Sequence, residues 1–370
     1  MKASRNFLHY INSGPYRILI VDDEAPHRAL EREILALPKY EVVEVASGEE
    51  ALAVLKTLAF DAVLLDKRMP GIDGDEICRR IRSDLSELLL PVIMVTGSGS
   101  SEDLSASMRA GATDFIRKPY NPLELTARVD AAVERKRMTD QLDSAESMLF
   151  ALARMVEAKD EYTGDHCSRL THNAIIFGQA LGLDQEELLA LRRGGVLHDI
   201  GKLGIPDSIL LKPGKLDDSE WVVMKSHTTI GSQLCGGLKS MTGTVSIIRS
   251  HHERCDGSGY PDGLKGEEIP LLARVFQFID IYDALSNERP YKKAMGRDQI
   301  IRIFEEETAR GWRDPELAGV FLDILRNRPE ELERTTSAIE DIGAHIYDEI
   351  ARTGALDWDR RRREAGGTAA

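Results

Sequence analysis

The chain has 370 residues, of which 42% are hydrophobic and 30% are charged, values that are ordinary for globular protein and leave room for two domains. A formal net charge of −14 argues against nonspecific binding to nucleic acid, so no DNA partner is expected. No apolar run is long enough to cross a bilayer, and Met1–Pro15 makes a poor signal peptide. Four widely spaced cysteines without a CxxC pair favour free thiols and a cytoplasmic protein with no membrane partner.

The first part of the chain, after an N-terminal extension over residues 1–14, alternates short apolar runs with segments of helical period. The expected strands are residues 17–21, 41–45, 62–65, 91–95 and 113–117. Strands that alternate with helices predict a five-stranded, parallel, doubly wound α/β sheet, and such sheets bind ligands at the carboxyl ends of their strands.

Polar residues stand where these strands end. Asp22, Asp23 and Asp66 would converge as a carboxylate cluster, which is costly unless a hard cation such as Mg²⁺ neutralises it. Thr96 and Lys118 would then offer a hydroxyl and an ammonium group to a phosphoryl group on Asp66. Any one of these residues alone is best read as a surface loop residue. Together, at successive strand ends, they predict a phosphorylation site.

The motifs VDDE, LLDKRMPGIDG, VTGS and FIRKP resemble the response-regulator receiver family over about residues 15–134. The resemblance implies that Asp66 accepts phosphate from a cognate sensor histidine kinase. It also implies that Mg²⁺ is bound by Asp22, Asp23 and Asp66. The acyl phosphate would be contacted by Thr96 and Lys118. Phe115 stands at the family's aromatic switch position, which a core residue explains equally well.

An apolar pattern continues beyond the final helix expected for this domain, residues 123–137. Apolar residues follow at alternating spacings of four and three: Met138, Leu142, Ala145, Leu149, Leu152 and Val156. A coiled coil between two copies and an amphipathic helix packed on the second domain explain this pattern equally well. We expect a connecting helix over residues 135–156 that carries the phosphorylation state to the output domain and, in the coiled-coil case, forms a homodimer.

Six of the nine histidines lie between His166 and His252, where the flanking sequence has helical period. We expect several helices to bring ligands into one bundle core. The candidates are His166, His198, Asp199, His227, His251, His252 and Asp280. His172 is interpreted as structural, and His9, His27 and His345 are expected to have no partners.

The His198–Asp199 pair favours two ions rather than one. Adjacent helix residues point about 100° apart, so a carboxylate that bridges two ions uses the pair better than a single tetrahedral site does. Two ions about 3.5–4 Å apart can stabilise the attacking and leaving oxygens at phosphorus. Imidazoles and carboxylates without thiolate favour Fe or Mn, with Zn as an alternative. Lys202 should share a helix face with Asp199 and contact the phosphate or the leaving group.

Residues from about 145 to 345 resemble the HD-GYP family, a subgroup of the HD-domain phosphohydrolases. The motifs are DEYTGDHCSRL, HDIGKLGIPD, HHERCDGSGYPDGLKGEEIP and ARVFQFIDIYDALSNERPY. The resemblance implies an all-α bundle that hydrolyses cyclic di-GMP with divalent metal ions, and a diguanylate cyclase as a partner. By position, the seven candidates match the metal ligands, and Lys202 and Asp199 match catalytic residues. Residues 346–370 are expected to form a tail.

Three further expectations follow from this resemblance. The signature loop Gly259, Tyr260 and Pro261 should shape the substrate lip or contact a partner. Arg289 should contact a substrate phosphate, although a buried structural ion pair is an equal alternative. Some members hold a third metal through a glutamate four residues before the first histidine. Tyr162 stands there in this chain, which predicts a two-metal site.

Two functions from different classes are consistent with the sequence. The first is a cyclic di-GMP phosphodiesterase controlled by phosphorylation of Asp66. The second is a phosphorylation-controlled scaffold that binds a cyclic dinucleotide with little or no turnover. The complete set of candidate ligands and Lys202 favour the enzyme, and a different cyclic dinucleotide remains open as its substrate.

Overall fold

A computed structural model of the chain describes residues 15–85, 88–97, 101–159, 166–288 and 293–333. They divide into two units, and the division falls between Ser144 and Ala145, inside one long helix. The first unit is a parallel α/β fold, and the described part of the second is built from helices.

The first unit is a five-stranded sheet in the order β2-β1-β3-β4-β5, with every neighbouring pair parallel. The strands are β1 (Tyr16–Val21), β2 (Tyr40–Val45), β3 (Ala62–Asp66), β4 (Val92–Thr96) and β5 (Asp114–Arg117). The intervening helices are α1 (Ala25–Ile34), α2 (Gly48–Leu55), α3 (Gly74–Ser83) and α4 (Ser101–Arg109). The predicted doubly wound parallel sheet is confirmed.

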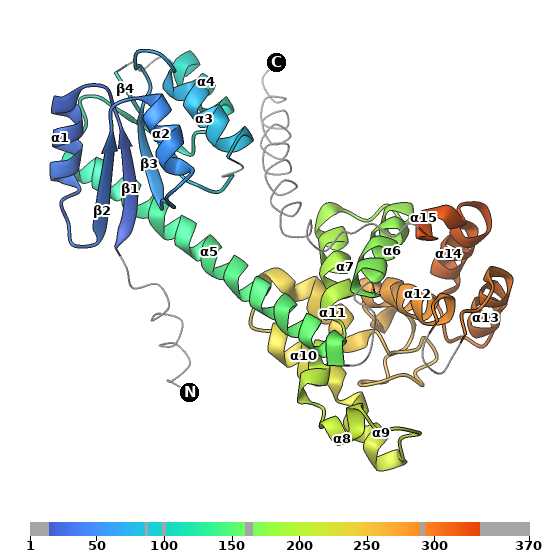
Figure 1. Ribbon diagram of the computed structural model, residues 1–370. Coiled ribbons are helices and arrows are strands. Elements are labelled where there is room, and N and C mark those ends of the chain that lie inside the picture. The colour runs from blue at the N-terminus through green and yellow to red at the C-terminus, as the bar shows by residue number, and fades with distance from the viewer. Residues whose placement is uncertain (1–14, 86–87, 98–100, 160–165, 289–292, 334–370) are drawn as a thin grey trace. The chain divides into compact units, whose positions relative to one another are not determined.

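Helices cover both faces of this sheet (Figure 1). Side chains alternate between the faces along each strand, as the two-residue period of a strand requires. In β1, Leu19 and Val21 pack with residues of α2 and α3, whereas Ile18 and Ile20 pack with residues of the helix that follows β5. Both faces of the sheet are therefore buried. Because β1, β3 and β4 are parallel neighbours, their carboxyl ends lie at one edge of the sheet.

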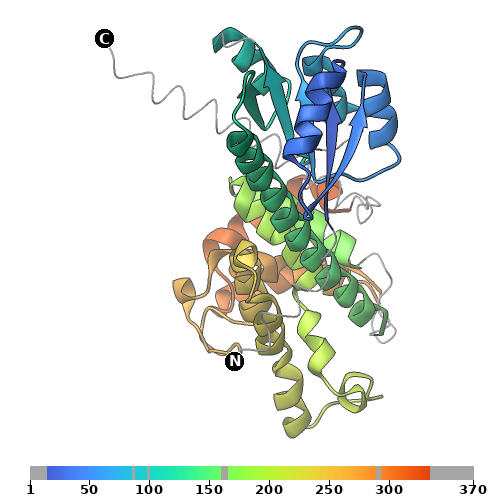
Figure 2. The ribbon, with the colours of Figure 1, turned by 90° about the vertical axis from the view of Figure 1, so that its left-hand side faces the viewer.

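The helix after β5 is α5, which runs without a break over Pro122–Lys159, 38 residues (Figure 2). Its predicted apolar seam is unevenly covered. Met138 and Leu142 are 65% and 50% exposed, whereas Val156 is only 4% exposed. In the second unit, Glu146 of α5 accepts hydrogen bonds from Arg193 at 2.7 Å. The later part of the seam thus packs on helices, as the amphipathic alternative predicts, and the earlier part does not.

The second unit carries α6 to α15 with short 3-10 helices between them. Its elements are α6 (His166–Ala180), α7 (Gln185–Leu197), η2 (Ile200–Gly204), α8 (Asp207–Leu210), α9 (Asp218–Lys225), α10 (His227–Cys235), η3 (Lys239–Met241), α11 (Thr242–Ser250), η4 (Gly266–Glu268), α12 (Leu271–Ser286), α13 (Arg297–Ala309), α14 (Pro315–Asn327) and α15 (Pro329–Glu333).

Aromatic packing holds the helices of this unit together. Phe177 of α6, Phe278 of α12 and Phe321 of α14 are fully buried, with ring centroids 5.1–5.7 Å apart. Such aromatic groups contribute large buried areas and directional ring contacts. The cluster fixes α6 against α12, and these two helices carry His166 and Asp280.

Candidate metal centre and phosphorylation pocket

Seven side chains gather in the second unit as two groups. One contains Asp199, His227, His251 and His252, and the other contains His166, His198 and Asp280. Within each group, the atoms able to bind a metal lie within 4.8 Å of one another. These are the seven residues that the motifs singled out, and the fold brings all of them together.

Helix ends supply most of these side chains. His166 begins α6, His227 begins α10, and His251 directly follows α11. The helix predicted to carry the His198–Asp199 pair ends at Leu197, and Asp199 directly precedes the 3-10 helix η2. Only Asp280 comes from a helix interior.

Asp199 lies between the two groups and faces both. Its Oδ1 atom is 3.3 Å from His227 Nε2 and 4.0 Å from His251 Nε2. Its Oδ2 atom is 3.3 Å from His198 Nε2. Burial opposes the charge on this carboxylate, but Lys202 and His198 outweigh burial and hold the pKa of Asp199 well below its ordinary value. A carboxylate with one oxygen toward each group is what bridging two ions requires.

The imidazoles of His227 and His251 are oriented by the backbone. His227 Nδ1 donates to the Met224 carbonyl at 2.8 Å, and His251 Nδ1 donates to the Ile248 carbonyl at 3.0 Å. Because a carbonyl cannot donate, the proton is on Nδ1 and the lone pair is on Nε2. Both Nε2 atoms are buried without a hydrogen-bond partner in the described chain. Burial also lowers the pKa of His251 to about 4. The two neutral imidazoles therefore each present an Nε2 lone pair that could bind a metal ion.

A buried carboxylate that the motifs did not reveal orients His166. Asp283 accepts a hydrogen bond from His166 Nδ1 at 2.6 Å and another from Arg169 Nε at 2.6 Å. Burial opposes the charge of Asp283, yet both hydrogen bonds together hold its pKa below the ordinary value. A carboxylate behind an imidazole fixes its tautomer and raises its basicity as a ligand. The available signal was the spacing of Asp283, three residues after Asp280 on α12.

Backbone contact between η2 and α10 sets the position of Asp199 relative to His227. A Cβ atom on Gly201 would lie 1.8 Å from the His227 carbonyl oxygen, so only glycine allows this approach. Lys202, in the same 3-10 turn, places Nζ 3.0 Å from Asp199 Oδ2. The predicted proximity of Lys202 to Asp199 is confirmed, although a 3-10 turn rather than an α-helix face provides it.

The signature loop folds over a second buried carboxylate to which the sequence reasoning gave no role. Glu253 is fully buried, and its carboxylate accepts hydrogen bonds from three successive backbone N–H groups at 2.7–3.1 Å, those of Asp262, Gly263 and Leu264. A Cβ atom on Gly259 would lie 2.3 Å from the backbone N of Arg254. The loop, which includes Pro261, thereby places the Tyr260 ring on His252, with centroids 4.8 Å apart.

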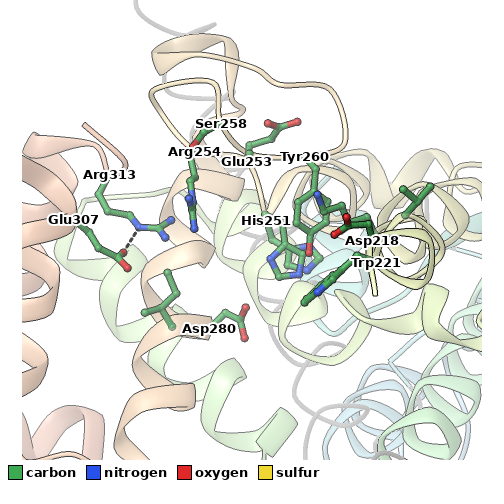
Figure 3. Close-up of a pocket in the computed structure, with 15 residues that line it drawn as sticks. Asp218, Trp221, His251, Glu253, Arg254, Ser258, Tyr260, Asp280, Glu307 and Arg313 are labelled. Carbon is green, nitrogen blue, oxygen red and sulfur yellow. Dashed lines mark hydrogen bonds and ion pairs between the residues drawn. The ribbon is translucent and has the colours of Figure 1, made fainter. Parts of the chain in front are cut away.

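A cavity of about 710 Å³ opens beside this centre. His251, His252 and Asp280 lie in its wall, and so does Tyr260 of the signature loop (Figure 3). A volume of this size accommodates a ligand larger than a single nucleotide base.

In the first unit, Lys118 joins the carboxylates of two strand ends. Its Nζ atom is 2.6 Å from Asp66 Oδ1 and 2.7 Å from Asp22 Oδ2. Burial opposes the ammonium charge, but hydrogen bonds to Asp22 and Asp66 raise the pKa of Lys118 above its ordinary value. Thr96 is buried at the end of β4, whereas Asp23 is exposed. Asp22, Asp23 and Asp66 do not approach one another closely enough to form a group like those above.

Two family models match the chain: that of the response regulator receiver domain over residues 18–130 and that of the HD domain over residues 150–317. The cyclic di-GMP phosphodiesterase response regulator RpfG of Xanthomonas campestris pv. campestris is 37% identical over 79% of this chain and 84% of its own length. The chain is a response regulator with an HD-GYP output domain. Its metal-dependent family agrees with the clustered ligands of the second unit.

Other relatives of this response regulator carry names with different substrates. A cyclic di-GMP phosphodiesterase of Thermotoga maritima is 31% identical over 85% of this chain and 94% of its own length. A 3′3′-cGAMP-specific phosphodiesterase of Vibrio cholerae is 38% identical over 51% of this chain and 42% of its own length.

No helix within the described ranges is both long and apolar enough to span a membrane.

The expectation that His27 has no partner is wrong. Its Nδ1 atom lies 3.0 Å from Lys118 Nζ and 3.4 Å from Asp22 Oδ2, because the first turn of α1 directs it back over the end of β1. His172, in contrast, contacts the Glu331 carbonyl at 2.8 Å, away from the metal centre, as a structural role predicts. Phe115 packs partly buried against the core of the first unit.

Four residues named in the predictions for this response regulator lie outside the described residues. They are Tyr162, on which the two-metal prediction depends, Arg289, His9 and His345.

Proposed function

We propose that this response regulator hydrolyses a 3′–5′ phosphodiester bond of cyclic di-GMP in the cavity beside Asp199, under the control of phosphorylation at Asp66. The observation that carries the proposal is the arrangement of Asp199, whose two oxygens face two separate groups of imidazole and carboxylate ligands. The names of the full-length relatives support cyclic di-GMP as the substrate.

The residues present suit two divalent ions, one for each group, and we favour Fe or Mn over Zn because no thiolate belongs to either group. When bound, such ions would act as Lewis acids toward water and the phosphoryl oxygens. The ammonium group of Lys202, beside Asp199, would hold a phosphate oxygen or stabilise the leaving oxygen. Asp283 would keep His166 in the orientation that offers Nε2 to its ion.

In the receiver, we propose that a sensor histidine kinase phosphorylates Asp66. Mg²⁺ would be held by Asp22, Asp23 and Asp66, which would have to move closer together than they lie in this structure. Lys118, which already contacts Asp66, would meet the acyl phosphate, and Thr96 would offer its hydroxyl. The exposed residues Met138 and Leu142 of α5 support a homodimer contact along the early part of that helix.

The test is incubation of the protein, reconstituted with Mn²⁺ or anaerobically with Fe²⁺, with cyclic di-GMP, followed by chromatographic separation of the products. The linear dinucleotide or GMP should accumulate, and Lys202→Ala should slow its formation about 100-fold or more, the usual scale for losing one group that stabilises a transition state. Cyclic di-GMP that is bound but returned intact by the metal-loaded protein would favour the scaffold alternative.

The control by phosphorylation is tested with acetyl phosphate as the donor. Turnover should change on phosphorylation of the unmodified chain and should stay constant in Asp66→Asn, which cannot be labelled. Glu102→Gln, which alters an exposed carboxylate on α4, is the matched control and should respond like the unmodified chain. Labelling that persists without Asp66 would contradict the assignment.

A further inference from the structure

One face of the short helix α9 lines the cavity beside the metal centre. Asp218, Trp221, Val222 and Lys225 all belong to the cavity wall, and their spacing of three, four and seven residues places them on a single helix face. Figure 3 shows Trp221 and Asp218 on the same side of the cavity, close to His251 and Tyr260.

The apolar side chains on this face are uncovered. Trp221 is 46% exposed and Val222 is 71% exposed. A helix ordinarily turns its apolar stripe toward the core, and single exposed hydrophobic residues elsewhere need no explanation. Here two adjacent apolar residues, one of them tryptophan, open into the cavity that also holds His251 and His252. A ligand bound at the metal centre would cover them.

The polar residues on this face narrow the chemistry of that ligand. The Asp218 carboxylate is exposed and makes no hydrogen bond or ion pair within the part of the chain described above. Lys225, one helical turn beyond Trp221, holds its ammonium group 5.3 Å from the centroid of the Tyr260 ring. An aromatic surface flanked by an acceptor and a cation suits a nucleobase joined to a phosphate.

We propose that this face of α9 binds one nucleobase of the substrate, with Trp221 stacked on the base and Asp218 accepting hydrogen bonds from guanine. Guanine presents two neighbouring N–H donors on its Watson–Crick edge, which a carboxylate can accept together, whereas adenine presents an acceptor beside its amino group. The inference rests on the proposed function, because it requires a cyclic dinucleotide to be bound at the metal centre. It makes Asp218 a specificity-determining residue.

Tryptophan fluorescence of the metal-loaded, full-length protein tests the stacking. Stopped-flow mixing with cyclic di-GMP, read before turnover consumes it, should quench the emission. Trp221→Phe should bind with an affinity within about threefold of the unmodified chain but lose most of the quench, because phenylalanine still stacks. Trp221→Ala should raise Kd and KM about tenfold or more. Metal content measured alongside shows whether the centre is intact in each variant.

Leu234→Ala is the matched control, because Leu234 is also 46% exposed but lies on α10 outside the cavity wall. It should leave Kd, KM and the quench unchanged. If Trp221→Ala keeps its metal and binds cyclic di-GMP as tightly as the control, the proposed role of α9 is wrong.

Competition between cyclic di-GMP, 3′3′-cGAMP and cyclic di-AMP tests Asp218. The unmodified chain should prefer ligands in the order of their guanine content, and Asp218→Asn should reduce the ratio of kcat/KM for cyclic di-GMP to that for cyclic di-AMP about tenfold. An unchanged ratio would overturn the role of Asp218.

Failure of this inference and failure of the proposed function give different results. If turnover of cyclic di-GMP is insensitive to Trp221→Ala, the proposed role of α9 is wrong and the phosphodiesterase function is supported. If cyclic di-GMP binds with a Trp221-dependent quench but is not hydrolysed, the phosphodiesterase function is wrong and the role of α9 is supported. A metal-loaded chain that neither binds nor hydrolyses the dinucleotide contradicts both.

Discussion

The two pockets of this chain differ in how their buried polar groups find partners. In the receiver, the single ammonium group of Lys118 contacts both Asp22 and Asp66, so it offsets part of the charge of the two buried carboxylates. In the output domain, the buried Nε2 atoms of His227 and His251 have no hydrogen-bond partner among the described residues. Unpaired buried nitrogen atoms cost free energy. The contact with Lys118 offsets part of the desolvation cost of Asp66, although burial still raises the pKa of Asp66 above its ordinary value.

This difference indicates how each pocket should depend on metal. In the receiver, Lys118 already offsets part of the charge of Asp22 and Asp66, so the fold would depend less on a bound Mg²⁺ ion. The output domain gains much more from a resident ion, because binding to the native state alone adds directly to stability. We therefore expect removal of metal to destabilise the output domain more than the receiver.

The largest expected effect comes from Asp199→Asn, which removes the one carboxylate among the described residues that faces both groups. We expect loss of bound metal and a fall in turnover of at least about 1,000-fold, since several kcal/mol of transition-state stabilisation depend on the ions. Plasma mass spectrometry and a product assay measure the two losses. Labelling of Asp66 by acetyl phosphate should be unaffected. A variant that retains its metal would break the comparison, because Asp199 would then not be the shared ligand.

A buried acid in the receiver, Glu31, allows a second test, because it should make the stability of the receiver depend on pH. Glu31 is 1% exposed, and its carboxylate accepts a hydrogen bond from the Tyr120 hydroxyl at 2.8 Å. Burial, opposed by this hydrogen bond, raises the pKa of Glu31 from 4.5 to about 7. The folded receiver therefore keeps this proton while the unfolded chain loses it, so stability falls as pH rises from about 4.5 to 7 and then stays low.

Glu31→Gln should remove this penalty. The gain in unfolding free energy should be about 3 kcal/mol at pH 8 and less than about 1 kcal/mol at pH 5. Hydrogen exchange of the β1 and β3 amides in the full chain, followed by mass spectrometry at both pH values, measures it. Glu33→Gln, on the exposed side of the same helix, is the control. An equal gain at both pH values would show that the proton on Glu31 is not responsible.

The smallest expected effect is that of Asp283→Asn. The variant keeps a hydrogen-bond acceptor for His166 but loses the negative charge that raises the basicity of the ligand. Metal affinity should fall about 10- to 100-fold, measured by competition with a chromophoric chelator. His172→Gln changes a histidine of the same helix that contacts the Glu331 carbonyl, and it should bind metal like the unmodified chain. If Asp283→Asn matches that control, the carboxylate serves only to fold α6 against α12.

The sequence was sufficient to predict the parallel sheet, and its motifs identified the residues that gather at both pockets. Short apolar runs predicted the strands. The polar residues that follow these strands predicted that Asp22, Asp66 and Lys118 lie together, as they do. The candidate ligands of the output domain could be named because residues such as His166 and His251 stand in dense motifs. A carboxylate of the His198–Asp199 pair between two ions was predicted, but which residues fall into each group was not, since that depends on how several helix ends converge.

What the sequence did not reveal are features that depend on how distant parts of the chain fold together. Glu253 follows His252 directly, yet its role depends on three N–H groups that the fold of the signature loop directs toward it. His27 has no motif around it, and only the start of α1 directs it toward Lys118. Trp221 has the spacing of an ordinary core residue, and only its exposure to the cavity distinguishes it.

Gly201 has a consequence for how the metal centre tolerates change. The His227 carbonyl occupies the space in which any larger residue would place its first carbon, 1.8 Å away. Even alanine would act as a wedge between η2 and α10, and a closely packed interior absorbs such an insertion only by moving backbone. A shift of about 1 Å is enough to separate ligands whose bonds allow an error of about 0.2 Å. The spacing between Asp199 and His227, two of the candidate ligands, thus depends on a glycine at position 201 that binds no ion itself.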